Sequence, residues 1–157
     1  MLVTFAQLRR ALVRGTGAAL ASTVALMACS RRETGSALAG LNAVSHWAFG
    51  DADASRDGFS ARRTLVGAMT QQAASVFWAA VMERWIVSRR RSPTLSRLAA
   101  DAAATSALAC AVDYTITPKR LTPGYELRLS KPSLAAVYVA FAAGLVIGSV
   151  LLPPRER

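Results

Sequence analysis

The feature that most constrains the fold of this chain is a C-terminal stretch, Pro132 to Pro154, that contains no charged residue. An α-helix rises about 1.5 Å per residue and the hydrocarbon core of a bilayer is about 30 Å thick, so about 20 apolar residues cross it. The stretch is long enough, and it ends in Pro153 and Pro154 before the arginines of the C-terminus. It therefore predicts a transmembrane helix near residues 133–152.

Three other apolar segments predict spanning helices, near residues 11–30, 64–87 and 98–117. The second has no charge from Thr64 to Met82 and is flanked by arginines on both sides. The third contains Asp101 and Asp113, whose separation of about 18 Å along a helix lets each carboxylate lie near one interface. We therefore expect an all-α fold in which residues 1–157 form a single integral membrane domain, a bundle of about four transmembrane helices.

The N-terminal segment allows two interpretations. In the first, residues 11–30 are retained as a transmembrane helix, and the long side chain of Arg14 reaches the interface. In the second, residues 1–28 are a signal sequence that is cleaved before Cys29, because Leu26–Cys29 is similar to the box of bacterial lipoproteins. The basic residues after Cys29 and the presence of later spans favour the first interpretation.

Residues 36–49, between the first two spans, are apolar but too few to cross a bilayer. Their second half carries the polar side chains of Asn42, Ser45 and His46 beside Trp47. This mixture is typical of a helix that lies in the membrane interface, or of a segment that dips into the bilayer and returns, rather than of a fifth span. We therefore expect a short interfacial helix near residues 36–49, in which His46 serves as a hydrogen-bonding group rather than as a metal ligand.

Polar side chains inside the predicted spans are candidates for a functional role, because an ionised group in a bilayer is costly and faces the bundle interior or water. These candidates are Gln72, Glu83, Asp101 and Asp113. Glu83 is expected either to have such a role or to sit at the interface, beside Arg84 or paired with the arginines at 89–91.

The two aspartates of the third span are expected in different surroundings. Asp101 is expected in the first turn of its helix, where the helix dipole favours an anion. Asp113 is expected near the last turn, where the dipole is unfavourable, so a cationic partner such as Lys119 or Arg120 is predicted.

Small residues recur every four positions in the last span, at Ala136, Ala140, Gly144 and Gly148. Steps of four residues keep them on one helix face, which lets a neighbouring backbone approach closely. The neighbour is expected to be another helix of the same chain or a second subunit, and the sequence leaves both open.

Charge and composition exclude several classes of function. The chain has 19 Lys and Arg against 9 Asp and Glu, and its net charge is +10. The arginines gather at the ends of apolar segments, which fits lipid headgroups better than nucleic acid. With one histidine, two cysteines outside any pair motif and no nucleophile–base motif, we expect no metal, no cofactor and no enzymatic activity.

Three segments resemble parts of small inner-membrane proteins of proteobacteria: Leu41–Trp47, Ala74–Trp78 with Glu83, and Asp113–Ser130. The resemblance covers most of the chain from Leu41 onward. It implies a multi-pass protein of the bacterial inner membrane, and it implies no activity.

The sequence also predicts the orientation and the role of the chain. The loop after the second span carries four arginines and no acid from Val87 to Arg97, which is typical of cytoplasmic loops and predicts cytoplasmic termini. The favoured role is structural or accessory, through helix contacts in the lipid bilayer with a second copy or with a membrane-protein partner. The alternative is a small transporter or channel subunit with a polar path through Gln72, Glu83 and Asp113.

Overall fold

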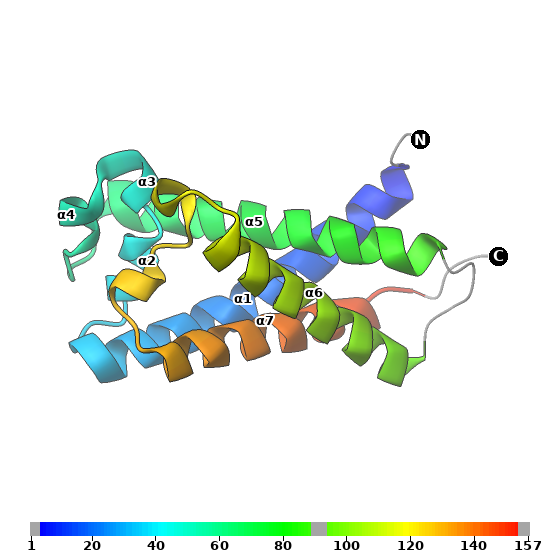
Figure 1. Cartoon of the computed structure of the whole chain (residues 1–157). Coiled ribbons are helices and arrows are strands. Elements are labelled where there is room, and N and C mark those ends of the chain that lie inside the picture. The colour runs from blue at the N-terminus through cyan, green and yellow to red at the C-terminus, as the bar shows by residue number, and fades with distance from the viewer. Residues whose placement is uncertain (1–3, 89–93, 154–157) are drawn as a thin grey trace.

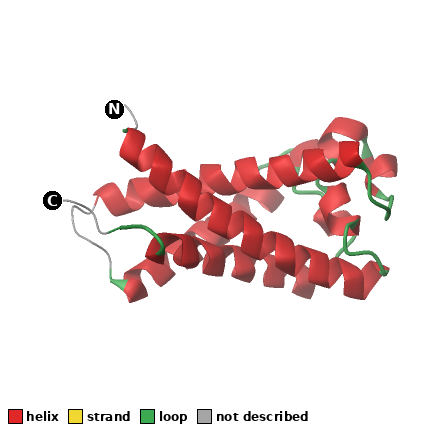
Figure 2. Ribbon diagram, turned by 180° about the vertical axis from the view of Figure 1, so that it is seen from behind, coloured by secondary structure: helices red, strands yellow, loops and turns green. Residues whose placement is uncertain are grey.

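The computed structural model describes residues 4–88 and 94–153, which form helices and loops and contain no strand (Figures 1 and 2). Four helices in this part of the chain are long and apolar enough to cross a membrane. They are α1 (Phe5–Thr34), α5 (Ala61–Ser88), α6 (Leu95–Thr115) and α7 (Lys131–Val150). Each of the four predicted spans is therefore a long helix.

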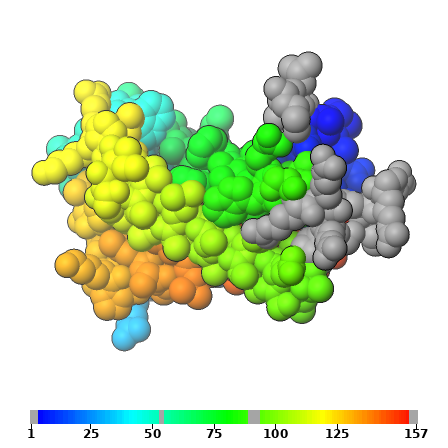
Figure 3. Space-filling model, turned by 45° about the vertical axis from the view of Figure 1, so that its right-hand side comes forward, coloured from blue at the N-terminus to red at the C-terminus, as the bar shows by residue number. Residues whose placement is uncertain are grey.

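The short elements gather at one end of the bundle, which we call the capped end (Figure 1). They are α2 (Ala39–Ala43), α3 (His46–Phe49), α4 (Asp51–Ala54), η1 (Lys119–Leu121) and η2 (Tyr125–Leu127). The start of α1, the end of α5, the start of α6 and the end of α7 lie at the opposite end, which we call the terminal end. Space-filling shows α6 across one face, between α5 and α7 (Figure 3).

Local capping explains why α1 is longer than the predicted span. The hydroxyl of Thr4 accepts a hydrogen bond from the backbone N–H of Gln7 at 3.3 Å, and the side chain of Gln7 accepts one from the N–H of Thr4 at 2.9 Å. This reciprocal pair satisfies two of the free N–H groups at a helix start. At the other end Gly35 adopts a left-handed φ of 80°, which side chains with a Cβ disfavour, and α1 stops there.

The predicted interfacial helix near residues 36–49 is wrong as a single surface helix. The segment forms α2 and α3 with a turn between them, and residues 39–46 are buried. The hydroxyl of Ser45 donates to the carbonyl of Asn42 at 2.7 Å, which favours the turn. The amide of Asn42 donates to the carbonyls of Arg56 and Gly58 at 3.0 and 2.9 Å, so the following loop folds over the segment.

Helices α1 and α7 approach each other closely where glycines meet. A Cβ added to Gly148 would lie 2.7 Å from the Cα of Arg14, and one added to Gly144 would clash with the carbonyl of Gly17. Half of the small-residue stripe of α7 therefore packs against α1 of the same chain. The other half of the stripe is not buried in this contact, since Ala136 is exposed and Ala140 is half-buried.

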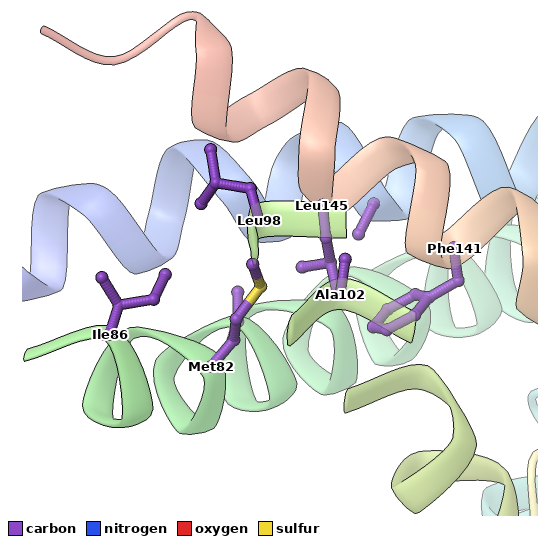
Figure 4. Close-up of a cluster of buried hydrophobic side chains, with 8 residues drawn as sticks. Met82, Ile86, Leu98, Ala102, Phe141 and Leu145 are labelled. Carbon is purple, nitrogen blue, oxygen red and sulfur yellow. The ribbon is translucent and has the colours of Figure 1, made fainter. Parts of the chain in front are cut away.

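Two apolar clusters form the core. One lies between the long helices toward the terminal end and contains Met82, Ile86, Leu98, Phe141 and Leu145, together with three alanines (Figure 4). The other ties the capped end to the bundle through residues of α1, α2, η2 and α7 and of the turns that follow α2 and η2: Leu26, Leu41, Val44, Tyr125, Leu129 and Val137. Between these clusters the packing leaves a cavity.

Candidate functional site

A cavity of about 110 Å³ lies among the four long helices, close to the capped end. Every long helix contributes a polar side chain to its wall. These are Ser22 from α1, Thr70, Gln71 and Ser75 from α5, Asp113 from α6 and Tyr138 from α7. The segment from Leu121 to Tyr125 closes the cavity from the side of the capped end.

A hydrogen-bonded chain between α5 and α1 forms one polar wall. The amide of Gln71 donates to the hydroxyl of Ser22 at 2.9 Å, and that hydroxyl donates to the carbonyl of Ala18 at 2.7 Å. Both side chains are buried, and so is Ser75 one turn further along α5. Polar groups are stable in an apolar bundle when they bond to one another in this way.

Gln72, the glutamine chosen from the sequence, lies outside the cavity. Its amide donates to the hydroxyl of Thr16 at 2.9 Å on a half-buried face of α5. Adjacent helix residues differ by about 100° in direction, so an error of one position exchanges Gln72 for the buried Gln71. The helical series Gly67, Gln71 and Ser75, all of them buried, is the signal that would have identified the correct face.

Asp113 supplies the acidic wall of the cavity. Its carboxylate accepts a hydrogen bond from the hydroxyl of Tyr138 at 2.6 Å. The predicted cationic partner is wrong for the residues that the structure describes: Arg120 donates instead to the backbone carbonyl of Trp47 at 3.3 Å, and no ion pair of Asp113 with Lys119 is formed. Tyr138 was not foreseen, because its partner comes from another helix.

Aromatic side chains make up much of the remaining wall: Trp47, Trp78, Tyr125, Tyr138 and Phe141. The indole N–H of Trp47 donates to the hydroxyl of Thr70 at 3.2 Å, which fixes the ring at the edge of the cavity. Burial raises the pKa of Tyr125 well above its usual value of 10, so its phenol stays neutral.

The closing segment is held in place by His46 and Gly124. The imidazole of His46 bonds to the Asp51 carboxylate at 3.0 Å through Nδ1 and to the Thr122 carbonyl at 2.9 Å through Nε2. Gly124 has a φ of 87°, and a Cβ there would clash with the carbonyl of Ala43. His46 is thus a hydrogen-bonding group, as expected, and it is buried within the protein.

A buried ion pair occupies the terminal end of the bundle. Arg14 of α1 is 2% exposed and Glu83 of α5 is 3% exposed, and the guanidinium contacts the carboxylate. The guanidinium also donates to the hydroxyl of Ser149 on α7 at 2.8 Å. The expectation that Arg14 extends to the interface is wrong, because its side chain is buried between the helices and bonded to Glu83 and Ser149.

Glu83 faces the bundle interior and pairs with Arg14, and a functional role for it stays a prediction. The arginines at 89–91 lie outside the described residues. Asp101 is buried as well, and its expected place in the first turn is wrong, because Thr94 caps a helix that begins at Leu95.

The cavity and the ion pair are separated by apolar packing. On α5, Ala79 and Met82 lie between Ser75 and Glu83 and are fully buried. Phe141 and Leu145 of α7 close the same layer (Figure 4). The structure therefore does not bring Gln72, Glu83 and Asp113 together into one path, and it places them at three separate positions.

In the part of the chain that the structure describes, no group of three or more His, Cys, Asp or Glu side chains could hold a metal ion. Comparison of the chain with protein-family models, with curated proteins and with solved structures gives no match. The resemblance to proteobacterial inner-membrane proteins stays a prediction.

Proposed function

We propose that the chain is a multi-pass membrane protein without enzymatic activity that binds a small molecule in the cavity among its four long helices. The observation that carries this proposal is the composition of the cavity wall, in which a carboxylate, a buried glutamine and two serines face aromatic rings. Polar groups inside a membrane bundle lower its stability unless they are bonded, and they mark binding sites and substrate paths. Pockets that bind small molecules combine apolar walls with a few polar groups in the same way.

The apolar layer between the cavity and the terminal end supports binding at a site that is closed on this side, rather than conduction through an open pore. Ala79, Met82, Phe141 and Leu145 separate the cavity from the terminal end. A transporter or transporter subunit built on this site requires the layer to open during each cycle, so the transporter alternative takes the form of a carrier and not of a channel.

The experiment that tests the proposal measures whether water and small solutes reach the cavity. In a background with Cys29→Ala and Cys110→Ala, Ser75→Cys places a thiol at the cavity wall. Ala79→Cys is the matched control, since it lies one turn further on the same helix face but inside the apolar layer. Purified proteins in lipid nanodiscs are treated with methyl methanethiosulfonate, and the labelling rate is followed by mass spectrometry.

Only an ionised thiol reacts, and burial in apolar surroundings suppresses ionisation. We expect Ser75→Cys to react at least about tenfold faster than Ala79→Cys, because each unit of thiol pKa changes the thiolate fraction about tenfold. Equal and slow labelling of both would show that the cavity is dry and closed, and would overturn the proposal.

The location belongs to the same proposal. We place the protein in the bacterial inner membrane with its termini in the cytoplasm. The described ends of the chain, residues 4 and 153, lie at the same end of the bundle as the start of the arginine-rich loop (Figure 1). The arginine content of that loop supports a cytoplasmic position for this end.

An accessory role through contact with a second copy is the second candidate, favoured by a groove of about 800 Å³ along the outside of α1 and α7. Exposed Leu20, Val24 and Ile147 border it, and Gly17 and Ala21 also line it. A small-residue floor allows close helix contact in lipid. The test is crosslinking in native membranes.

In the same cysteine-free background, Leu20→Cys is expected to form a disulfide-linked dimer on mild oxidation. The matched control is Leu65→Cys, an exposed position on α5 away from this groove. Equal yields of dimer at both positions would show random collision, and would remove this candidate.

A further inference from the structure

We infer that the cavity binds a compact organic cation of the alkylammonium class, held by the Asp113 carboxylate and by the surrounding aromatic rings. This inference rests on the proposed function and names the chemical class of its ligand.

The charge of the cavity wall points to a cation. Among the described residues that line it, Asp113 is the one with an ionisable carboxylate, and none is a lysine, arginine or histidine. Within the described part of the chain the carboxylate receives a hydrogen bond from Tyr138 and no ion pair. A negative charge near an apolar wall attracts a cation more strongly than the same charge in water does.

The hydrogen-bond donors of the wall argue against an anion. The amide of Gln71 donates to Ser22, the indole N–H of Trp47 donates to Thr70, and the phenol of Tyr138 donates to Asp113. An anion is held best where a positive charge assists the hydrogen bonds, and none of the described lining residues carries one, while these three donors already bond to neighbouring groups of the wall. A cation without N–H groups needs no hydrogen-bond donor from the wall.

The aromatic side chains complete the fit. Trp47, Trp78 and Phe141 line the cavity from three different elements, α3, α5 and α7. The faces of aromatic rings attract cations, and quaternary ammonium groups are recognised by cages of this kind. Asp113 and these rings together therefore offer both charge and dispersion contacts to an alkylated ammonium.

Volume limits the size of the ligand. A cavity of about 150 Å³ holds benzene, which has six heavy atoms. The 110 Å³ found here gives room for roughly four or five heavy atoms at the same packing. Tetramethylammonium, with five heavy atoms, has this size.

The experiment measures protection of Ser75→Cys from methyl methanethiosulfonate in the nanodisc protein. The two probes are tetramethylammonium chloride and tert-butanol, which is its neutral counterpart of the same size and shape. Sodium chloride at equal concentration controls for ionic strength. Each probe is tested with Asp113 intact, with Asp113→Asn and with Asp113→Glu.

We expect half-maximal protection by tetramethylammonium at a concentration about tenfold lower than by tert-butanol, because only the cation gains the charge interaction. Asp113→Asn keeps an acceptor for Tyr138 and should remove this preference, and Asp113→Glu should keep it. If Asp113→Asn fails to fold, the comparison of the two probes on the protein with Asp113 intact still decides the question.

Equal protection by both probes, or an unchanged preference in folded Asp113→Asn, would overturn the cation inference while the cavity remained a binding site. Labelling of Ser75→Cys that neither probe slows would overturn the cation inference too. Failure of the proposed function is a different result, in which Ser75→Cys reacts no faster than Ala79→Cys without any probe.

Discussion

The buried pair of Arg14 and Glu83 provides a quantitative prediction about stability. Glu83→Gln removes the negative charge and leaves a side chain of nearly the same shape. Arg14 then keeps its positive charge inside the bundle, where it is 2% exposed and where Ser149 is a neutral partner. The expected result is a strong destabilisation.

The size of the effect follows from burial. Removing one partner of a buried ion pair costs about 3–5 kcal/mol, because the remaining charge has lost its compensation. Replacing both partners with apolar residues of similar volume is often neutral or stabilising. We therefore expect a loss of about 3–5 kcal/mol for Glu83→Gln and for Arg14→Met, and a much smaller change when Arg14→Met is combined with Glu83→Met.

The assay is reversible unfolding of the purified protein by sodium dodecyl sulfate in mixed micelles, followed by circular dichroism. Arg9→Met is the matched control, because Arg9 lies on the same helix and is exposed. Its expected cost is below about 1 kcal/mol, as for other exposed charges. If Glu83→Gln cost no more than Arg9→Met, or if the double variant were as unstable as the single ones, the reasoning would be refuted.

Two further substitutions test the packing at the two ends of the bundle. Gly144→Leu should destabilise the bundle by more than the roughly 1–3 kcal/mol typical of overpacking, because even a Cβ there clashes with Gly17. Ala136→Leu, on the exposed part of the stripe, should change the free energy of unfolding by less than about 0.5 kcal/mol. Similar effects of the two variants in the same unfolding assay would contradict the α1–α7 contact. Asn42→Ala leaves the carbonyls of Arg56 and Gly58 without their donor, so amide hydrogen exchange at residues 55–60 should become at least about tenfold faster than in the wild type. Unchanged exchange would show that Asn42 does not hold this loop.

The long helices could be predicted from the sequence because their cause is local. Length, apolar character and flanking charge identify a segment that can cross a bilayer, and all of these are properties of consecutive residues. The positions at which the helices begin were predicted less accurately than the helices themselves. Thr4 and Thr94 cap their helices several residues before the apolar segments begin, so α1 and α6 start earlier than the predicted spans.

The candidate site was predicted only in part, because its contacts join residues far apart in the chain. Glu83 and Asp113 were identified from their cost in a membrane, but their partners Arg14 and Tyr138 lie on other helices. Arg14 in particular was assigned to the interface, since an arginine near a helix start commonly reaches lipid headgroups. Only the packing of α1 against α5 shows that it is buried.

The cap over the cavity was not predictable from hydropathy. Residues 36–49 have the composition of a surface helix, yet Asn42 and His46 form hydrogen bonds to loops that follow much later in the chain. The glycine at 124 allows its loop to approach Ala43 at a φ of 87°, and the sequence alone shows it only as part of a turn. Long-range hydrogen bonds therefore decide the structure of this end.

The central claim is that the four helices cross the bilayer and hold a cavity close to the capped end, which an apolar layer separates from the terminal end. The most direct measurement labels Ser75→Cys in sealed membrane vesicles with a membrane-impermeant, cationic methanethiosulfonate reagent, in both vesicle orientations. The side of the chain termini is identified in the same vesicles by protease cleavage of a C-terminal tag. The account predicts labelling only from the side opposite to the tag. Labelling only from the side of the tag would contradict it.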